Sequence, residues 1–328
     1  MRLVGVELTR LRWRRAVTIL LAGCVLVPAL VWYSLVWDTR PVTAEEIRQA
    51  KEVVAQNRQD NQQMIDECVA RPEEYGVPTT GDVEGACEQT FGFGDEQYEW
   101  YLTRQPLDVG DQRKGSGLGV ITILAAFLML VGTTFAGHDW NSGSLSNQLL
   151  FEPRRLRVWG AKAVAVGAVS LVVSLVVLTA WWAALWLVAE QRDVQASAHT
   201  WELIRNSALR GSLVVTLAAV AGYALTMFFR STVATLGVMF AVAVVGQIAA
   251  VAVFGEGVIR WLIPTNVAAV VFNGFDYYSP DHFCTNADIG PNGCMEHLGL
   301  GAGTTYLAVL VALVVGLSVW SFRRRDVP

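Results

Sequence analysis

Long apolar stretches alternate with polar segments along this chain, and their lengths predict its architecture. An α-helix needs about 20 apolar residues to cross the roughly 30 Å hydrocarbon core of a bilayer. The pattern therefore predicts an all-α polytopic membrane protein with six transmembrane helices. The six stretches are 16–37, 117–136, 163–189, 207–229, 232–254 and 302–322.

The first 15 residues have the pattern of a helix that lies along the membrane surface. Apolar side chains such as Leu3 and Leu11 can face lipid, while five arginines face water and anionic headgroups. A signal-peptide start is the alternative, but the run at 16–37 exceeds the roughly 7–15 residues of a signal core. That run also ends in aromatic rather than small residues. We therefore predict an interfacial helix at 1–15.

Residues 38–116 form a polar region that holds 17 of the 29 acidic residues. Within it, 44–69 has the pattern of a helix, with Glu45 in the first turn and Val54 and Ile65 on one face. We expect a large extracellular helical loop domain between the first two spans. It is either a cap that contacts a substrate or partner, or a structural lid without its own ligand.

A second long loop, 255–301, contains an apolar run at 260–272 that is too short to cross a bilayer. We predict a re-entrant or interfacial element there, ahead of the last span. The remainder of this loop is rich in turn-forming residues.

Charge predicts the orientation of these spans. Hydrophobic residues make up 53% of the chain and charged residues 16%, below the roughly 25% of soluble domains. Placing the N-terminus, 137–162, Arg230 and 323–328 inside gives the inner segments 13 of the 25 basic residues but four of the 29 acidic ones. By the positive-inside rule, both termini are cytoplasmic and both large loops extracellular. The preference for Arg over Lys, with abundant Ala and Val, is typical of a GC-rich bacterium, so we expect a bacterial plasma membrane.

Four of the five cysteines fall in the two predicted extracellular loops, which suits disulfides in an oxidising compartment. Four cysteines allow three pairings. Because partners are expected to share a loop, we predict Cys68–Cys87 and Cys284–Cys294. A zinc site is the alternative for the second loop, and the disulfide is preferred because the compartment is oxidising. The four zinc ligands would be His282, Cys284, Cys294 and His297.

The segment 137–162 is a polar interruption between two spans and ends in a basic cluster. It resembles the loop between the second and third helices of type-2 class ATP-binding-cassette exporter permeases, the membrane-spanning subunits whose coupling helix docks on an ATPase. That family usually has Glu and Thr where Asp139 and Ser144 stand here. The residues that carry the resemblance are Asp139, Gly143, Ser144, Leu145, Pro153, Arg154, Arg155 and Lys162.

The resemblance extends along the chain. The pattern E-L-x-R-L-x-x-R-R from Glu7 to Arg15 is similar to the elbow helix of that family, and Ile263-Pro264 to a Leu-Pro element before its last span. It implies that two copies of this chain, or this chain and a homologous permease, pair within the membrane lipid. It also implies cytoplasmic ATPase subunits that bind ATP and Mg²⁺ and drive export of an amphipathic or lipid-like substrate.

We predict a single coupling helix over 138–152. Asp139 would stand at its start, where the helix dipole favours a carboxylate, and Gly143 would allow close approach of a partner. An apolar face would fit a groove on the ATPase. That face is formed by Leu145, Leu149 and Leu150.

Polar residues inside the spans are few. His138 beside Asp139 could suggest a proton relay, but a solvated polar turn at the water interface is preferred. Gln247 is the one strongly polar side chain in the middle of a span, where helix packing is preferred over lining a transport path. The middle of every predicted span lacks Asp, Glu, Lys and His, which argues against proton-driven transport.

The sequence contains no P-loop, so ATP hydrolysis would have to come from a partner chain. We expect no catalytic site, cofactor or metal ion in this chain and no nucleic-acid partner. The alternative function is a non-transporting membrane sensor or assembly protein whose extracellular domain binds a ligand or partner. A neighbouring gene for an ATPase with a P-loop would distinguish the exporter from this alternative.

Overall fold

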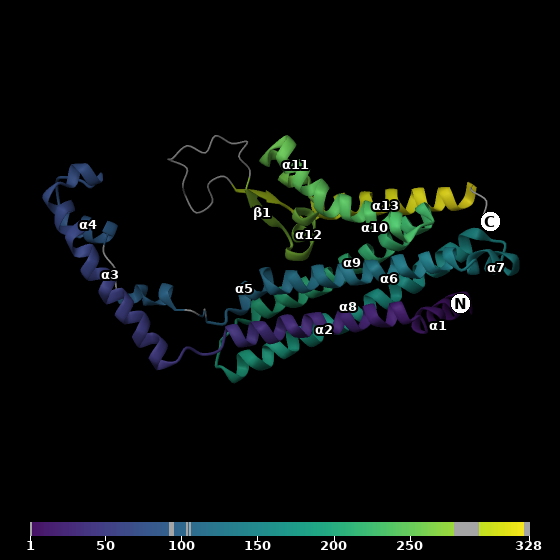
Figure 1. The fold of residues 1–328 in the computed structure, drawn as a ribbon, viewed down its shortest axis with the longest axis horizontal. Coiled ribbons are helices and arrows are strands. Elements are labelled where there is room, and N and C mark those ends of the chain that lie inside the picture. The colour runs from purple at the N-terminus through teal and green to yellow at the C-terminus, as the bar shows by residue number, and fades with distance from the viewer. Residues whose placement is uncertain (1, 92–94, 103, 105, 279–294, 325–328) are drawn as a thin grey trace. The chain divides into compact units, whose positions relative to one another are not determined.

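The computed structural model describes residues 2–91, 95–102, 104, 106–278 and 295–324. The chain divides into two compact units, and each is described by itself (Figure 1). One unit, the membrane unit, combines Met1–Tyr33 with Asp108–Pro328; the other, the insert, is Ser34–Leu107.

Six helices in the described part of the chain are long and apolar enough to cross a membrane, as predicted. Two of them, the third and the fourth, begin well before their apolar runs. The third continues into the basic end of the 137–162 segment, and the fourth takes up much of the predicted loop 190–206. The spans are α2 (Arg15–Asp38), α6 (Ser116–Asn141), α8 (Arg155–Gln191), α9 (Ala198–Phe229), Thr232–Phe254 and α13 (Leu300–Arg324).

Hydrogen bonds at the helix ends explain where some of these helices begin. Ser197 accepts a hydrogen bond from the Thr200 backbone N–H at 3.1 Å, which caps α9. Asp108 caps the short helix α5 (Val109–Lys114), which leads into α6. Capping satisfies N–H groups that have no partner inside the helix. Polar residues therefore extend α9 well beyond the apolar run at 207–229.

The fifth span contains a π-helical stretch. It consists of α10 (Thr232–Phe240), η3 (Ala241–Gly246) and α11 (Gln247–Phe254). Gln247 lies at the junction of η3 and α11, and its amide donates to the Val242 carbonyl at 3.0 Å. Its oxygen accepts from the Ile263 backbone N–H at 3.1 Å. Gln247 therefore joins a carbonyl in the π-helical stretch to the first turn of α12, in line with a packing role.

Helix α9 packs against α6, α8, α12 and α13 and lies at the centre of the membrane unit (Figure 1). Its closest approach to α6 depends on two glycines. A Cβ atom on Gly132 would lie 2.2 Å from the Ala219 carbonyl oxygen, and one on Gly222 would lie 2.6 Å from the Met129 carbonyl oxygen. Both positions leave no space for a side chain, so the two backbones are in direct contact, as is common between membrane helices.

The predicted re-entrant region is a short helix followed by a hairpin. It contains η4 (Glu256–Trp261) and α12 (Ile263–Phe272), then β1 (Phe275–Tyr278) paired antiparallel with β2 (Met295–Leu298). The all-α prediction is therefore wrong for these two strands. The strands form because Tyr277 and Leu298 pack with Ala269 of α12 in a small apolar core.

The predicted Cys284–Cys294 disulfide and three of the four residues of its zinc alternative lie outside the described residues. The fourth zinc candidate, His297, is on β2 opposite Asp276. Its Nδ1 atom is 2.7 Å from the Asp276 carboxylate, and both side chains are exposed. His297 therefore already has an acidic partner on the neighbouring strand.

The insert is built on α3 (Ala44–Ala70), close to the predicted helix at 44–69. Thr43 and Glu46 form a capping box at its start, and the Thr43 backbone N–H lowers the pKa of the Glu46 carboxyl. Helix η1 (Pro72–Tyr75), helix α4 (Val83–Phe91) and helix η2 (Asp95–Tyr101) follow. The predicted Cys68–Cys87 disulfide is confirmed, and it joins α3 to α4.

Removing this disulfide is expected to destabilise the insert. Ile65 and Val77 form a small buried cluster with the two bonded cysteines, so the bond carries much of the constraint there. For a separation of 19 residues, loss of the bond costs about 3 kcal/mol. The double variant Cys68→Ala/Cys87→Ala should therefore be cleaved by protease at lower temperature than the wild type. Cys24→Ala, which changes a cysteine outside the disulfide, is the control; equal cleavage of all three proteins would contradict the expectation.

Enlarging Gly132 or Gly222 is expected to separate α6 from α9. Overpacking of this kind costs about 1–3 kcal/mol. Gly132→Val and Gly222→Val should each lower the melting temperature of the protein in detergent. Gly119→Val is the matched control, because it lies on the same helix α6 with open space around its Cβ position. If all three variants melt alike, the contact between α6 and α9 does not limit stability.

Candidate functional site

A sharp turn separates the end of α6 from the short helix that leads to α8. Helix α6 ends at Asn141, and α7 (Ser144–Phe151) begins after Gly143. Gly143 has a φ angle of +66°, in the left-handed region that favours glycine. No atom lies within 4 Å of its Cβ position, so the turn rather than close packing requires this glycine. The prediction of one helix over 138–152 is therefore wrong.

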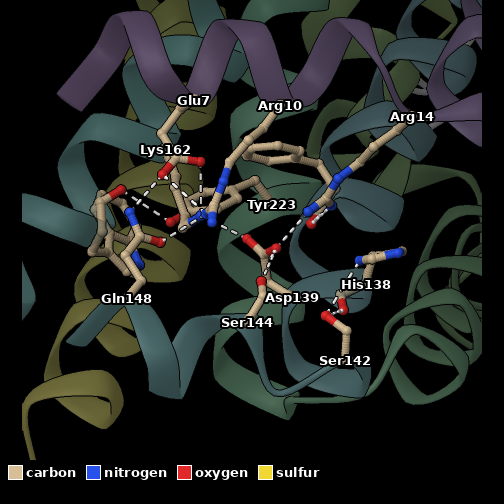
Figure 2. Close-up of polar contacts among 12 residues, drawn as sticks. Glu7, Arg10, Arg14, His138, Asp139, Ser142, Ser144, Gln148, Lys162 and Tyr223 are labelled. Carbon is tan, nitrogen blue, oxygen red and sulfur yellow. Dashed lines mark hydrogen bonds and ion pairs between the residues drawn. The ribbon is translucent and has the colours of Figure 1, made fainter. Parts of the chain in front are cut away.

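Asp139 consequently lies in the last turn of α6 and not at the start of a coupling helix. Its side chain is fully buried, which corrects the prediction of a solvated turn. His138, by contrast, is exposed, and its Nδ1 atom is 3.5 Å from the Ser142 hydroxyl (Figure 2). The two neighbouring residues therefore lie in different environments, and the contacts of His138 do not make it a relay partner of Asp139.

Asp139 belongs to a buried cluster of charges. The Lys162 ammonium donates to Asp139 Oδ2 at 2.6 Å and to Glu7 Oε2 at 2.8 Å, and all three side chains are fully buried (Figure 2). Arg14 is paired with Asp139 Oδ1. We call Glu7, Arg14, Asp139 and Lys162 the buried charge cluster. These four residues are two carboxylates and two cations, so their own charges balance. Arg10, which is partly exposed, lies 3.7 Å from Glu7 at the edge of the cluster.

The cluster joins helices that are far apart in the sequence. Glu7 is on α1 (Arg2–Arg12), Asp139 on α6 and Lys162 two turns inside α8. Arg14 also donates to the Phe135 carbonyl oxygen at 2.6 Å. The Phe135 ring lies beneath both cations, with its centroid 4.7 Å from the Arg14 guanidinium carbon and 5.2 Å from the Lys162 nitrogen. These contacts fix α1 against the ends of α6 and α8.

Helix α7 is hydrogen-bonded to both carboxylates. Ser144 donates to Asp139 Oδ1 at 2.7 Å, and Gln148 donates to Glu7 Oε1 at 2.6 Å (Figure 2). Ser144 and Gln148 are four residues apart and so share one face of α7. Arg10, which is partly exposed, donates to the Gln148 oxygen at 3.4 Å. The short helix is thus bound to the cluster at its start and at its middle.

A second set of contacts extends from α8 to two further spans. Tyr223 of α9 is fully buried and donates its hydroxyl to the Trp159 carbonyl oxygen at 3.0 Å. The indole N–H of Trp159 donates to Ser318 of α13 at 3.2 Å. Because Trp159 lies three residues before Lys162, the start of α8 is in contact with most of the bundle.

The remaining residues predicted for coupling are distributed over α7 and its flanks. Leu145 is buried inside the chain, so it does not belong to an exposed apolar face. The exposed apolar side chains are Leu150 and Phe151, which are 80% and 90% exposed. Pro153 and Arg154 are exposed in the link between α7 and α8. Only Asp139 and Ser144 of the predicted set belong to the polar contacts of the cluster.

Sequence reasoning missed Glu7, Arg14 and Gln148 as site residues and gave Lys162 no partner. One signal was available, because Glu7 is the only acidic residue among the first 37. A single acid within an arginine-rich helix requires an explanation that a lipid-facing helix does not give.

No protein-family model, curated protein or solved structure matches the chain.

Removing one member of the cluster is expected to be costly. Lys162→Met would leave two buried carboxylates without the ammonium they share, a change that costs about 3–5 kcal/mol in other buried pairs. The melting temperature in detergent should fall clearly, while Arg157→Met, an exposed position on the same helix, should have little effect. The double variant Glu7→Gln/Lys162→Met, which keeps the pair of Asp139 and Arg14, should recover most of the loss. If Lys162→Met melts like the control, the cluster is not needed for stability.

Proposed function

We propose that this chain is the membrane-spanning permease subunit of an ATP-driven exporter, and that α7 is the element on which a cytoplasmic ATPase subunit docks. The observation that carries the proposal is the division of α7 along its length. Its first and fifth residues, Ser144 and Gln148, are hydrogen-bonded to the buried charge cluster. Its last two residues, Leu150 and Phe151, are exposed apolar side chains of the kind that anchor protein interfaces.

This arrangement would let movement of a bound partner reach the membrane spans through α7. A partner that binds Leu150 and Phe151 at the end of α7 acts on a helix that contacts Asp139 of α6 through Ser144 and Glu7 of α1 through Gln148. Lys162 joins both carboxylates to α8. Movement of α7 is therefore passed to three membrane-associated helices through charged and hydrogen-bonded contacts.

Several further features belong to the proposal. The α7 end of the bundle, where the basic residues Arg154 and Arg157 lie, faces the cytoplasm of a bacterium, as do both termini. ATP and Mg²⁺ bind to the partner ATPase. Two copies of the chain, or this chain and a homologous permease, form the pathway for an amphipathic or lipid-like substrate. Asp139, Gly143 and Ser144 position α7, and Pro153 and Arg154 border the docking surface.

The test is to remove the exposed apolar anchors of α7. Leu150→Glu/Phe151→Glu should fold normally, because both side chains are exposed. Loss of a central anchor costs about 2 kcal/mol or more, so docking of the ATPase encoded beside this gene should weaken roughly thirtyfold. The measurement is co-purification of that ATPase, followed by the ATP hydrolysis of the complex.

The matched control is Val53→Glu/Met64→Glu, which adds the same two negative charges at exposed apolar positions of the insert. It should leave docking unchanged, because the insert lies on the extracellular side in this proposal. Wild-type docking by the α7 variant would refute the role of α7. If no P-loop ATPase is encoded nearby or co-purifies with the wild type, the exporter assignment fails and a membrane sensor or assembly protein is favoured.

A further inference from the structure

Two adjacent cavities lie between α8 and α9 and at the connection between them. That connection is at the end of the bundle away from α7 (Figure 1). The first, of about 320 Å³, runs between the two helices and is lined mainly by apolar side chains such as Leu175, Leu178 and Leu209. The second, of about 410 Å³, lies at the connection from α8 to α9. Trp186 and Trp201 line both cavities, so the two are immediate neighbours.

The first cavity has the dimensions and lining of a site for a hydrocarbon chain. Along α8 it reaches from Leu175 to Trp186, eleven residues, which corresponds to about 16 Å of helix. The Ser212 hydroxyl in its lining already donates to the Ala208 carbonyl oxygen at 2.9 Å. Ligand sites are commonly apolar cavities of about 300–1,000 Å³ with a few polar groups at fixed positions.

The second cavity has the acidic side chains that the first lacks. Glu190 and Asp193 line it, and both side chains are exposed. Arg205, which lines the first cavity, lies one helical turn after Trp201 and so on the same side of α9. Charges of both signs therefore flank the two indole rings. Trp side chains are enriched at the level of lipid headgroups, and their faces attract cations.

We propose that these cavities form a binding site for a zwitterionic phospholipid with an amine-containing headgroup. One acyl chain occupies the cavity between α8 and α9. The phosphate lies beside Arg205, and the ammonium group lies between Glu190, Asp193 and the Trp faces. An anionic headgroup would meet two carboxylates, and a purely cationic amphiphile would meet the arginine. A zwitterion matches both signs of charge, and this binding does not depend on the chain being a transporter.

The experiment uses the full chain in nanodiscs with a small fraction of lipid that carries a photoactivatable group on one acyl chain. Phosphatidylethanolamine is compared with phosphatidylglycerol that bears the same chain, and labelled peptides are mapped by mass spectrometry. Labelling by phosphatidylethanolamine should concentrate on 175–186 and 201–212. Glu190→Gln/Asp193→Asn and Arg205→Gln should each reduce this labelling by about tenfold, the usual size of losing a charged contact.

Two further variants separate recognition from general lipid contact. Glu202→Gln lies on an exposed part of α9 outside both linings and should label like the wild type. Ala183→Trp fills the first cavity from an exposed position and should block labelling without lowering the melting temperature. Equal labelling by the two lipids, uniform labelling of all lipid-facing helices, or an equal effect of Glu202→Gln would each overturn the proposal. No ATPase is present, so these outcomes are independent of the docking experiment.

Discussion

The ammonium group of Lys162 is fully buried, and much of the arrangement of the membrane unit serves to neutralise its positive charge. A buried charge without a partner costs several kcal/mol, so the group needs carboxylates from its neighbours. One comes from α6 and the other from α1, a helix more than 150 residues earlier in the chain. Each carboxylate has remaining lone pairs, which Arg14, Ser144 and Gln148 fill. The requirement to satisfy one cation thus determines where α1 and α7 can lie.

Two kinds of packing meet at the start of α8. Apolar contacts between membrane helices gain little from burial, because lipid is as apolar as a leucine side chain. Close backbone contact at Gly132 and Gly222 holds α6 to α9, and polar contacts of Trp159 hold α8 to α9 and α13. The buried charge cluster is directional and fixes register, whereas glycine packing mainly fixes distance. Together they give the bundle its specific arrangement near α7.

The spans could be predicted from the sequence because a bilayer imposes a minimum apolar length, and the apolar runs of the chain reach that length. It misjudged helix ends wherever polar residues continue a helix, as at 155–162 and 198–206, because capping and packing there outweigh composition. The break at Gly143 had a local signal in Asn141-Ser142-Gly143, three residues typical of turns. The sequence near Lys162 carries no such signal for its partner Glu7, because a contact between residues 7 and 162 depends on the assembled fold. Cys68–Cys87 was predictable because both cysteines share one short segment.

The contacts of α7 also limit how it can respond to a partner. Ser144 and Gln148 each donate to a charged oxygen, and bonds of this kind are worth about 1.5–3 kcal/mol apiece. A shift of α7 by an ångström or two would break both unless Asp139 and Glu7 moved with it. In an exporter, docking at Leu150 and Phe151 would therefore either carry the ends of α1 and α6 along or exchange the cluster for a second arrangement. Both are discrete responses, because balanced buried charges have few satisfied configurations. A helix of eight residues is thus sufficient to act on three longer ones, provided that its buried face is held by charge.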